Sequence, residues 1–155
     1  MRVAGALYVA LFALLACGGD DGGSSGGDAA HEVCVAETNR LRQMAGKPAL
    51  ARSAELEAYA DEGAMVDFDS EPHRHFSSTS GGGIAFAENE CPQQGNWKLP
   101  VGGDMSALVV QCIAAFYSEG PGGGHYDNMM SNNTKLGCGI YQVDTRVTIV
   151  QDYGR

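Results

Sequence analysis

The sequence predicts a single α+β domain in which three amphipathic helices precede two C-terminal strands. Its 155 residues are 44% hydrophobic, which provides for one compact core and excludes a wholly disordered chain. Gly fills 22 positions, about twice the usual share of roughly 7%, so long uninterrupted helices cannot make up the chain. Apolar residues recur at helical spacing in three segments, and strand-like segments close the chain.

The N-terminal segment has the features of an export signal. One Arg precedes an apolar run over residues 3–16, which is shorter than the roughly 20 residues that span a bilayer and fits a secretory signal. The run ends in Leu14-Leu15-Ala16-Cys17, which resembles the bacterial lipobox, where the Cys is acylated. We therefore expect residues 1–16 to be a signal peptide and Cys17 to carry the lipid; an ordinary signal peptide, cleaved nearby, is the alternative.

The next segment is predicted to be a tether. Residues 18–30, GGDDGGSSGGDAA, hold no large apolar side chain, so they cannot bury enough surface to offset their conformational entropy. We expect residues 17–30 to be the lipidated Cys and a flexible acidic tether, and residues 31–155 to be the folded domain.

Two helices are predicted in the first half of this domain. The first covers about residues 32–45, where Cys34 and Leu41 share a stripe, and Gly46-Lys47-Pro48 ends it. The second covers about residues 53–67, with Ser53 as N-cap.

The second half is predicted to contain one more helix and the two strands. Residues 68–99 are predicted to be irregular because Gly and Pro interrupt this segment repeatedly. A third helix is expected over about residues 104–118, beginning at an Asp N-cap. Two strands are expected over residues 136–143 and 146–153, joined by a short turn at Asp144-Thr145.

The charge balance excludes some partners. Lys and Arg total 10 against 19 Asp and Glu, for a net charge of -9. We expect no nucleic-acid partner, since such proteins need basic groups to neutralise phosphates, and no electrostatic docking on anionic membranes. The sequence also has no G-x-S-x-G elbow and no Gly-rich phosphate loop.

Five cysteines leave an odd count, which a lipid on Cys17 would remove. The remaining four are an even set in an exported domain, which favours two structural disulfides. Three pairings are possible, and the sequence does not choose among them. The four are Cys34, Cys91, Cys112 and Cys138.

Glu119 has an unusual position at the end of the third predicted helix. At 100° per residue it lies within about 20° of the apolar stripe formed by Leu108 and Cys112. An unpaired carboxylate on a buried seam is costly. Either the helix has ended and Glu119 turns into solvent, or a partner at the rim of the core holds it.

The histidines are the candidate partners. His73 and His75 form an H-x-H pair, His125 follows Glu119 closely, and His31 lies at the tether junction. Imidazoles beside a carboxylate could hold a divalent ion, with Zn²⁺ favoured, although by spacing alone surface histidines are the simpler interpretation. Two further acids are expected in a solvated loop, Glu88 and Glu90.

Several ordered segments resemble one known family. Gly124-His125-Tyr126-Asp127-Asn128-Met129-Met130, followed by Lys135-Leu136-Gly137-Cys138-Gly139, resembles the signature of the CAP superfamily of cysteine-rich secretory, antigen 5 and pathogenesis-related proteins. Further segments agree in order over residues 33–154: Asn39-x-x-Arg42 with Gly46-x-Pro48-x-Leu50, Ala87-Glu88-Asn89, Phe116-Tyr117-Ser118-Glu119 and the closing Val150-Gln151-Asp152-Tyr153-Gly154.

The resemblance implies a single-domain α–β–α three-layer sandwich with a cleft lined by two His and two Glu. By position these are His125, Glu119, Glu88 and either His75 or His73, of which His75 is preferred. Family members can hold a divalent ion between the two His, so Zn²⁺ or another divalent metal is the expected cofactor, with metal ligands His75 and His125. Asp127 and Asn128 replace the usual Thr-Gln and Met130 stands where Trp is common, so the ligand could differ from the family's sterols and lipids.

Three function classes follow. The preferred one is a lipid-anchored, extracytoplasmic module of the cell envelope, at the outer membrane or cell surface, which binds a metal and a lipid or other small ligand. The second is a metal-assisted hydrolase with Glu88 or Glu119 as general base. The lack of an obvious nucleophile argues against it. The third is a structural or interaction lipoprotein with a vestigial site.

Overall fold

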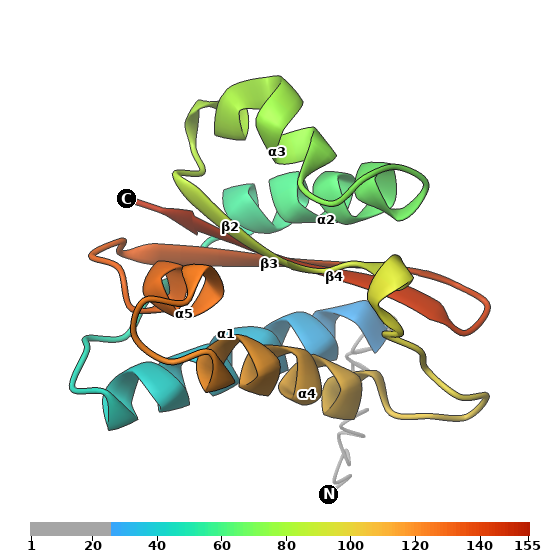
Figure 1. Cartoon of the computed structure of the whole chain (residues 1–155), viewed down its shortest axis with the longest axis horizontal. Coiled ribbons are helices and arrows are strands. Elements are labelled where there is room, and N and C mark those ends of the chain that lie inside the picture. Colours follow the sequence, from blue (N-terminus) through green and yellow to red (C-terminus); the bar gives the residue numbers. More distant parts are fainter. Residues whose placement is uncertain (1–25) are drawn as a thin grey trace, which may run out of the picture.

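The computed structural model describes residues 26–155, which form three layers (Figure 1). A four-stranded sheet lies between helices α2 and α3 on one face and helices α1 and α4 on the other, with the short α5 beside its edge. The expected α–β–α sandwich is therefore confirmed. The expected signal peptide and Cys17 lie outside the described residues. Within the described part, no helix is both long enough and apolar enough to cross a membrane.

The helices and strands follow one another in mixed order. They are α1 (Gly26–Met44), β1 (Ala51–Arg52), α2 (Ala54–Phe68), α3 (Arg74–Thr79), β2 (Ala87–Cys91), α4 (Met105–Ser118), α5 (Gly124–Met129), β3 (Lys135–Val143) and β4 (Arg146–Gly154), with short 3-10 turns at Ser80–Gly83 and Gln93–Gly95.

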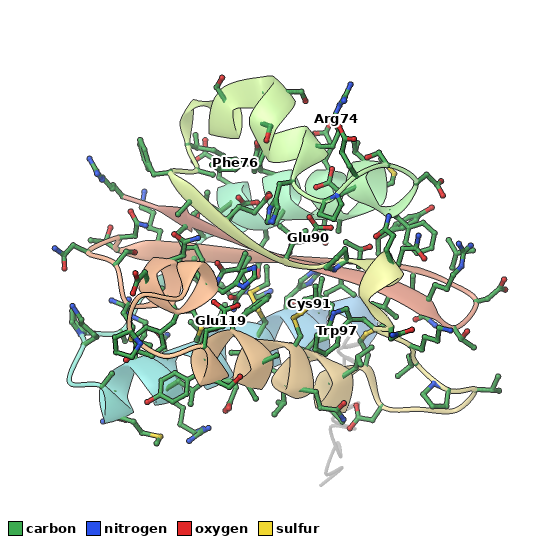
Figure 2. All side chains as sticks on the ribbon, viewed as in Figure 1. Arg74, Phe76, Glu90, Cys91, Trp97 and Glu119 are labelled. Carbon is green, nitrogen blue, oxygen red and sulfur yellow. A yellow bond between two sulfur atoms is a disulfide. The ribbon has the colours of Figure 1, made fainter. Side chains whose placement is uncertain are left out.

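The strand order places β2 at an edge of the sheet. The order is β1-β3-β4-β2, in which β1 is parallel to β3 and the other neighbours are antiparallel. Successive side chains of a strand point to opposite faces. In Figure 2, accordingly, Glu90 lies on the side of α2 and α3, whereas the next residue, Cys91, lies on the side of α4.

The main apolar core lies on the α1 and α4 side of the sheet. Leu108, Ile113 and Phe116 of α4 are buried there against Leu136 and Ile149 of the strands. Both disulfides are on this side. Cys34 of α1 is bonded to Cys138 of β3, and Cys91 of β2 is bonded to Cys112 of α4. The expectation of two disulfides is confirmed, and the structure supplies the pairing.

The opposite face packs closely because β3 carries two glycines there. A Cβ on Gly137 would lie 2.2 Å from the backbone carbon of Leu56, and one on Gly139 would lie 2.0 Å from the carbonyl oxygen of Ala60. The backbones of α2 and β3 therefore touch directly. Cys138, between the two glycines, points to the other face, where it reaches α1.

Several predicted elements are confirmed at their boundaries. Ser53 caps α2 by accepting a hydrogen bond from the N–H of Leu56, and Asp104 caps α4 by accepting one from the N–H of Ser106. Strands β3 and β4 each extend one residue beyond the expected range, and the turn between them lies at the expected residues. Helix α1 begins at Gly26 rather than at residue 32, because Asp28 forms an ion pair with Arg52 and Ala30 is fully buried.

The prediction that residues 68–99 are irregular was wrong in part, because this segment contains α3 and β2. Both are short, and β2 reads Ala-Glu-Asn-Glu-Cys, without a β-branched or aromatic residue. Helix α5, also missed, has only six residues. Tertiary contacts, which local sequence patterns do not report, stabilise these elements.

Candidate functional site

The first part of the candidate site is a pair formed by His73 and Glu88. The Nδ1 atom of His73 lies 2.8 Å from Oε1 of Glu88. Glu88 is on β2 and its side chain is 2% exposed, whereas the His73 ring, in the loop before α3, is 40% exposed. The imidazole is therefore fixed by a buried carboxylate while its other edge stays open to solvent.

Glu90 holds the backbone that carries this imidazole. Its Oε2 accepts a hydrogen bond of 2.6 Å from the N–H of His73, and the same oxygen lies 3.8 Å from the His73 Nδ1. His73 has φ 61° and ψ 15°, a left-handed conformation that costs a non-Gly residue of order 1–3 kcal/mol and often marks functional sites. The two glutamates of β2 thus hold His73 by its ring and by its backbone.

Asn89, between the two glutamates, points to the opposite face. Its amide donates to the carbonyl oxygen of His125 at 3.1 Å and to the hydroxyl of Tyr153 at 3.1 Å. Asn128 of α5 donates to the Glu88 carbonyl oxygen and to the Asn89 side-chain oxygen, each at 3.0 Å. These bonds attach α5, and with it His125, to strand β2.

The second part of the site is a pair formed by Glu119 and His125. Helix α4 ends at Ser118, so Glu119 is its C-cap, and its side chain is 35% exposed. It accepts a hydrogen bond of 3.0 Å from the N–H of His125 and lies 2.5 Å from the His125 Nδ1. The His125 ring also stacks on Phe116, with centroids 4.6 Å apart. Of the two alternatives for Glu119, the structure shows the second: although the helix ends at Ser118, the carboxylate is held by His125.

The two pairs have the same chemical form. In each, Nδ1 faces a carboxylate, so Nε2 is the nitrogen available to an ion or ligand; a carboxylate on the far nitrogen is typical of metal-binding His. His73, Glu88 and Glu90 offer ligand atoms that all lie within 4.8 Å of one another. Oε2 of Glu88 and Oε1 of Glu90 are buried and have no hydrogen-bond partner. The residues on the β2 side of the site therefore fit a divalent ion.

The two glutamates that face a histidine differ in electrostatic environment. Burial raises the pKa of Glu88, and the hydrogen bond from His73 only partly opposes this. The same bond raises the pKa of His73. In the exposed pair, the hydrogen bond from His125 lowers the pKa of Glu119. Glu119 is thus the readily ionised carboxylate of the site, whereas burial disfavours the charged form of Glu88.

Sequence comparison assigns the chain to a family. The profile of the cysteine-rich secretory protein family, CAP, matches residues 35–153. The chain belongs to this family. No curated protein matches the chain.

Two solved structures share the CAP fold. The crystal structure of Na-ASP-1 superposes with a TM-score of 0.62 at 18% identity, covering 82% of this chain and 39% of that one. The crystal structure of NaASP2 with Zn²⁺ superposes with a TM-score of 0.60 at 21% identity, covering 84% of this chain and 82% of that one. This chain therefore spans less than half the length of Na-ASP-1.

The structure brings some of the predicted site residues into the His–Glu pairs and leaves others outside them. Glu88, Glu119 and His125 lie in the two His–Glu pairs, and the histidine beside Glu88 is His73. His75, which was preferred from the sequence, is 6% exposed and packs on Tyr59 at 4.5 Å between ring centroids. The difference arises because α3 begins at Arg74, so its first turn directs His75 inward against α2.

Other residues of the CAP domain were placed wrongly or missed. Glu90 was expected in a solvated loop but is 3% exposed on β2. Asp67 and Asp152, which are fully buried on the same face, were not singled out. The spacing of Glu88 and Glu90 by two residues is the one local pattern that could have placed both side chains on the same face. This pattern is informative only once the segment is known to be a strand. His31 lies elsewhere, 3.0 Å from Asp61.

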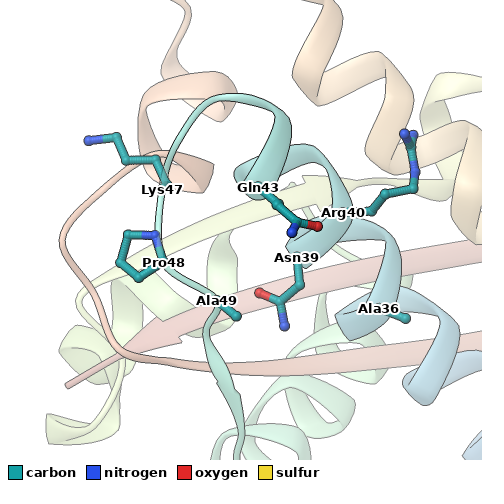
Figure 3. A pocket seen from close by; sticks show the side chains of 7 residues that line it. All are labelled: Ala36, Asn39, Arg40, Gln43, Lys47, Pro48 and Ala49. Atoms are coloured by element: carbon teal, nitrogen blue, oxygen red, sulfur yellow. The ribbon is translucent and has the colours of Figure 1, made fainter.

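The surface hollows do not all coincide with the site. A hollow of about 280 Å³ adjoins His73 and is lined by Glu71, Pro72, Arg74, Ser77 and Ser78 as well. A larger hollow of about 540 Å³ lies at the C-terminal end of α1 (Figure 3). There the Arg40 and Lys47 side chains extend away from each other, and none of the lining residues belongs to the His–Glu pairs.

Proposed function

We propose that the protein is an extracytoplasmic CAP binding module that holds a divalent cation between its two His–Glu pairs and presents it to a small ligand. The observation that carries the proposal is the shared form of the pairs, in which each imidazole uses Nδ1 for a carboxylate and keeps Nε2 available. Imidazole nitrogen favours Zn²⁺ among divalent ions. Once bound, such an ion polarises a ligand oxygen as a Lewis acid.

The hollow beside His73 suggests the chemistry of the ligand. Its lining includes Arg74, Ser77 and Ser78, together with Glu71, which lies 2.9 Å from Arg74 in an ion pair. Such a lining favours a small polar ligand over a lipid tail, which requires an apolar cavity. The residue roles follow: His73 and His125 ligate, Glu88 and Glu119 orient the rings, and Arg74 contacts the ligand.

Metal titration tests this proposal. Full-length protein treated with chelator is titrated with Zn²⁺ by isothermal calorimetry. We expect one equivalent to bind, and His73→Ala and His125→Ala each to weaken binding at least tenfold. His31→Ala is the matched control, because His31 is also paired with a carboxylate but lies outside the site. Equal affinity in all four proteins would contradict the proposal.

The lipid anchor belongs to the same proposal. The apolar run that ends in Leu14-Leu15-Ala16-Cys17 supports attachment of the domain to a membrane of the cell envelope through acylated Cys17. Metabolic labelling with a fatty-acid analogue tests it. We expect label on the wild-type protein, none on Cys17→Ser, and release of that variant from the membrane fraction. Label that persists on Cys17→Ser would refute the anchor.

Metal-assisted hydrolysis is the second candidate function. It is favoured by the position of Glu119, a carboxylate that is 35% exposed and lies beside the imidazole of His125, where it could accept a proton from a metal-bound water. Zn²⁺-dependent turnover of a peptide or ester library that is lost in Glu119→Gln would establish it. A library without turnover would leave binding as the function.

A further inference from the structure

A polar hollow lies at one end of the sheet, and no residue of the His–Glu pairs lines it. Its volume is about 460 Å³, and it lies where the loop after α5 meets residues next to the start of β2 and the end of β4. Figure 1 shows α5, the start of β2 and the end of β4 at this same end of the sheet. We call it the asparagine hollow. Its lining includes Asn128, Asn132 and Asn133, together with Ser131, Phe86 and Arg155.

The loop that forms one wall of the asparagine hollow is fixed by a buried arginine. Arg42 of α1, which is 1% exposed, donates to the carbonyl oxygen of Met129 and, at 3.1 Å, to that of Ser131. At the end of the loop, the N–H of Thr134 donates to the carbonyl oxygen of Gly154 at 2.9 Å. The loop is thus attached to α1 and to β4, so this wall is formed before a ligand binds, as is usual for small-molecule sites.

A second wall is an exposed aromatic ring. Phe86 is 54% exposed, and its backbone N–H donates to the carbonyl oxygen of Tyr153 at 2.8 Å, which fixes its place beside β4. The guanidinium carbon of Arg155 lies 4.8 Å from the centre of the ring. The fold therefore sets the position of the ring while much of the residue stays in water. Such a ring offers a ligand a flat apolar surface, and the guanidinium beside it offers hydrogen-bond donors.

The asparagines differ in how far the protein already uses them. The side-chain amide of Asn128 donates to the Glu88 carbonyl oxygen at 3.0 Å, and that of Asn133 donates to the Ser131 hydroxyl at 2.9 Å. These bonds hold both side chains in place. Asn132 is exposed, and within residues 26–155 its side chain makes no hydrogen bond. Because a side-chain amide has donors and an acceptor, the hollow offers a ligand both kinds of group.

The lining indicates a neutral ligand that is rich in hydroxyl groups. None of the described residues that line the hollow is an Asp or Glu, although the chain has 19 of these against 10 Lys and Arg. Arg155 is the one cation among those lining residues. A lipid tail would leave the amides without partners, and a polyanion requires several basic groups. A hydroxyl both donates and accepts, as an amide does, so a saccharide satisfies this lining.

We propose that the asparagine hollow is a saccharide-binding site, which takes a short neutral oligosaccharide. The apolar C–H face of one sugar ring packs on Phe86, and its hydroxyls form hydrogen bonds with Asn132 and Arg155. The site goes beyond the proposed function and does not depend on it, because it uses no metal ion and neither His–Glu pair. An extracytoplasmic domain that has this site would attach to a polysaccharide as well as hold its own ligand in the cleft.

Saturation-transfer NMR with defined trisaccharides tests the proposal. The probes are cellotriose and triacetylchitotriose, and the full-length protein is kept in a detergent without a sugar head group. We expect at least one probe to bind to the wild-type protein. Phe86→Ala should weaken this binding roughly tenfold and Asn132→Ala roughly fivefold, which are the effects of losing an aromatic contact and a hydrogen bond. Both residues are exposed, so we expect an unchanged Tm in each variant.

Gln43→Ala is the matched control, because it removes an exposed side-chain amide from the larger hollow at the end of α1. We expect it to bind the trisaccharide as the wild type does. His73→Ala should also keep saccharide binding while it loses Zn²⁺ affinity, so the two proposals can fail separately. Inorganic phosphate is the anionic probe. Wild-type protein that binds phosphate but neither trisaccharide, or that binds none of the three, would overturn the saccharide site, as would unchanged affinity in both Phe86→Ala and Asn132→Ala.

Discussion

Asp152 makes the stability of the metal-free protein depend on pH. Its pKa is raised from the ordinary 3.8 to about 9 in the folded state, so the folded state holds a proton that the unfolded state releases. The free energy of unfolding therefore falls as pH rises from about 4 to about 9, by up to about 1.4 kcal/mol per pH unit for this one group. Asp152→Asn should be the more stable protein above neutral pH.

Urea unfolding at pH 5, 7 and 9 in the presence of chelator measures this effect. The wild-type midpoint should decrease across the series more steeply than that of Asp152→Asn. Glu90, whose pKa burial raises to about 7, contributes in the same direction in both proteins over the lower half of the range. Parallel profiles of the two proteins would contradict the assignment of the slope to Asp152.

Single residues of the site were predictable where local geometry decides their position. The position of Glu119 on the stripe of α4 indicated either a helix end with the side chain in solvent or a partner, and His125 is that partner. The choice between His73 and His75 was not predictable, because it depends on the left-handed conformation of His73 and on the residue at which α3 begins. Asp152 was beyond local reasoning, since its importance arises from its register opposite Glu88.

At the scale of the element, the contact between α2 and β3 depends on glycine. Gly139→Ala would place a Cβ 2.0 Å from the Ala60 carbonyl oxygen, so the helix must move away from the sheet. Overpacking of this kind costs typically about 1–3 kcal/mol and occasionally more. We expect a loss of at least about 2 kcal/mol in chemical denaturation. Gly124→Ala is the control, because nothing lies within 4 Å of its Cβ position; a similar loss in both variants would contradict the explanation.

The long elements were predictable and the short ones were not. Helices α2 and α4 have caps and apolar stripes of their own, and β3 and β4 form a hairpin with a short turn. Strand β2 is polar in sequence, and its pairing with β4 together with its contacts to His73 and α5 gives it a defined place. Because β2 carries Glu88 and Glu90, the least predictable element is the one on which the proposed function depends most.

At the scale of the whole molecule, the two disulfides should differ in their contribution to stability. Cys34–Cys138 spans a sequence separation of 104 residues and Cys91–Cys112 one of 21. In the chain-entropy description, loops of those lengths correspond to about 4.7 and about 3.3 kcal/mol. Replacing the first pair with Ala should therefore destabilise the protein more than replacing the second. Guanidinium unfolding of the two double variants measures the difference, and the reverse order would contradict it.

The layer arrangement could be predicted from the sequence only through family resemblance. Composition and periodicity indicate one α+β domain, but they do not state which helices cover which face of the sheet. The profile match over residues 35–153 and the shared fold of the two solved structures confirm that arrangement. The chemistry of the hollow beside His73 was not predictable from the resemblance, since lining residues such as Arg74 lie outside the family motifs.

The Cys91–Cys112 disulfide links the two elements that carry the His–Glu pairs of the candidate site. Cys91 directly follows Glu90 on β2, and Cys112 lies on the helix whose end carries Glu119. This bond therefore ties the strand that holds His73 to the helix that holds His125. A newly made chain gains that tie only after it reaches an oxidising compartment. If the protein is exported as proposed, the two elements that carry the His–Glu pairs become covalently linked only after synthesis, when the chain is oxidised.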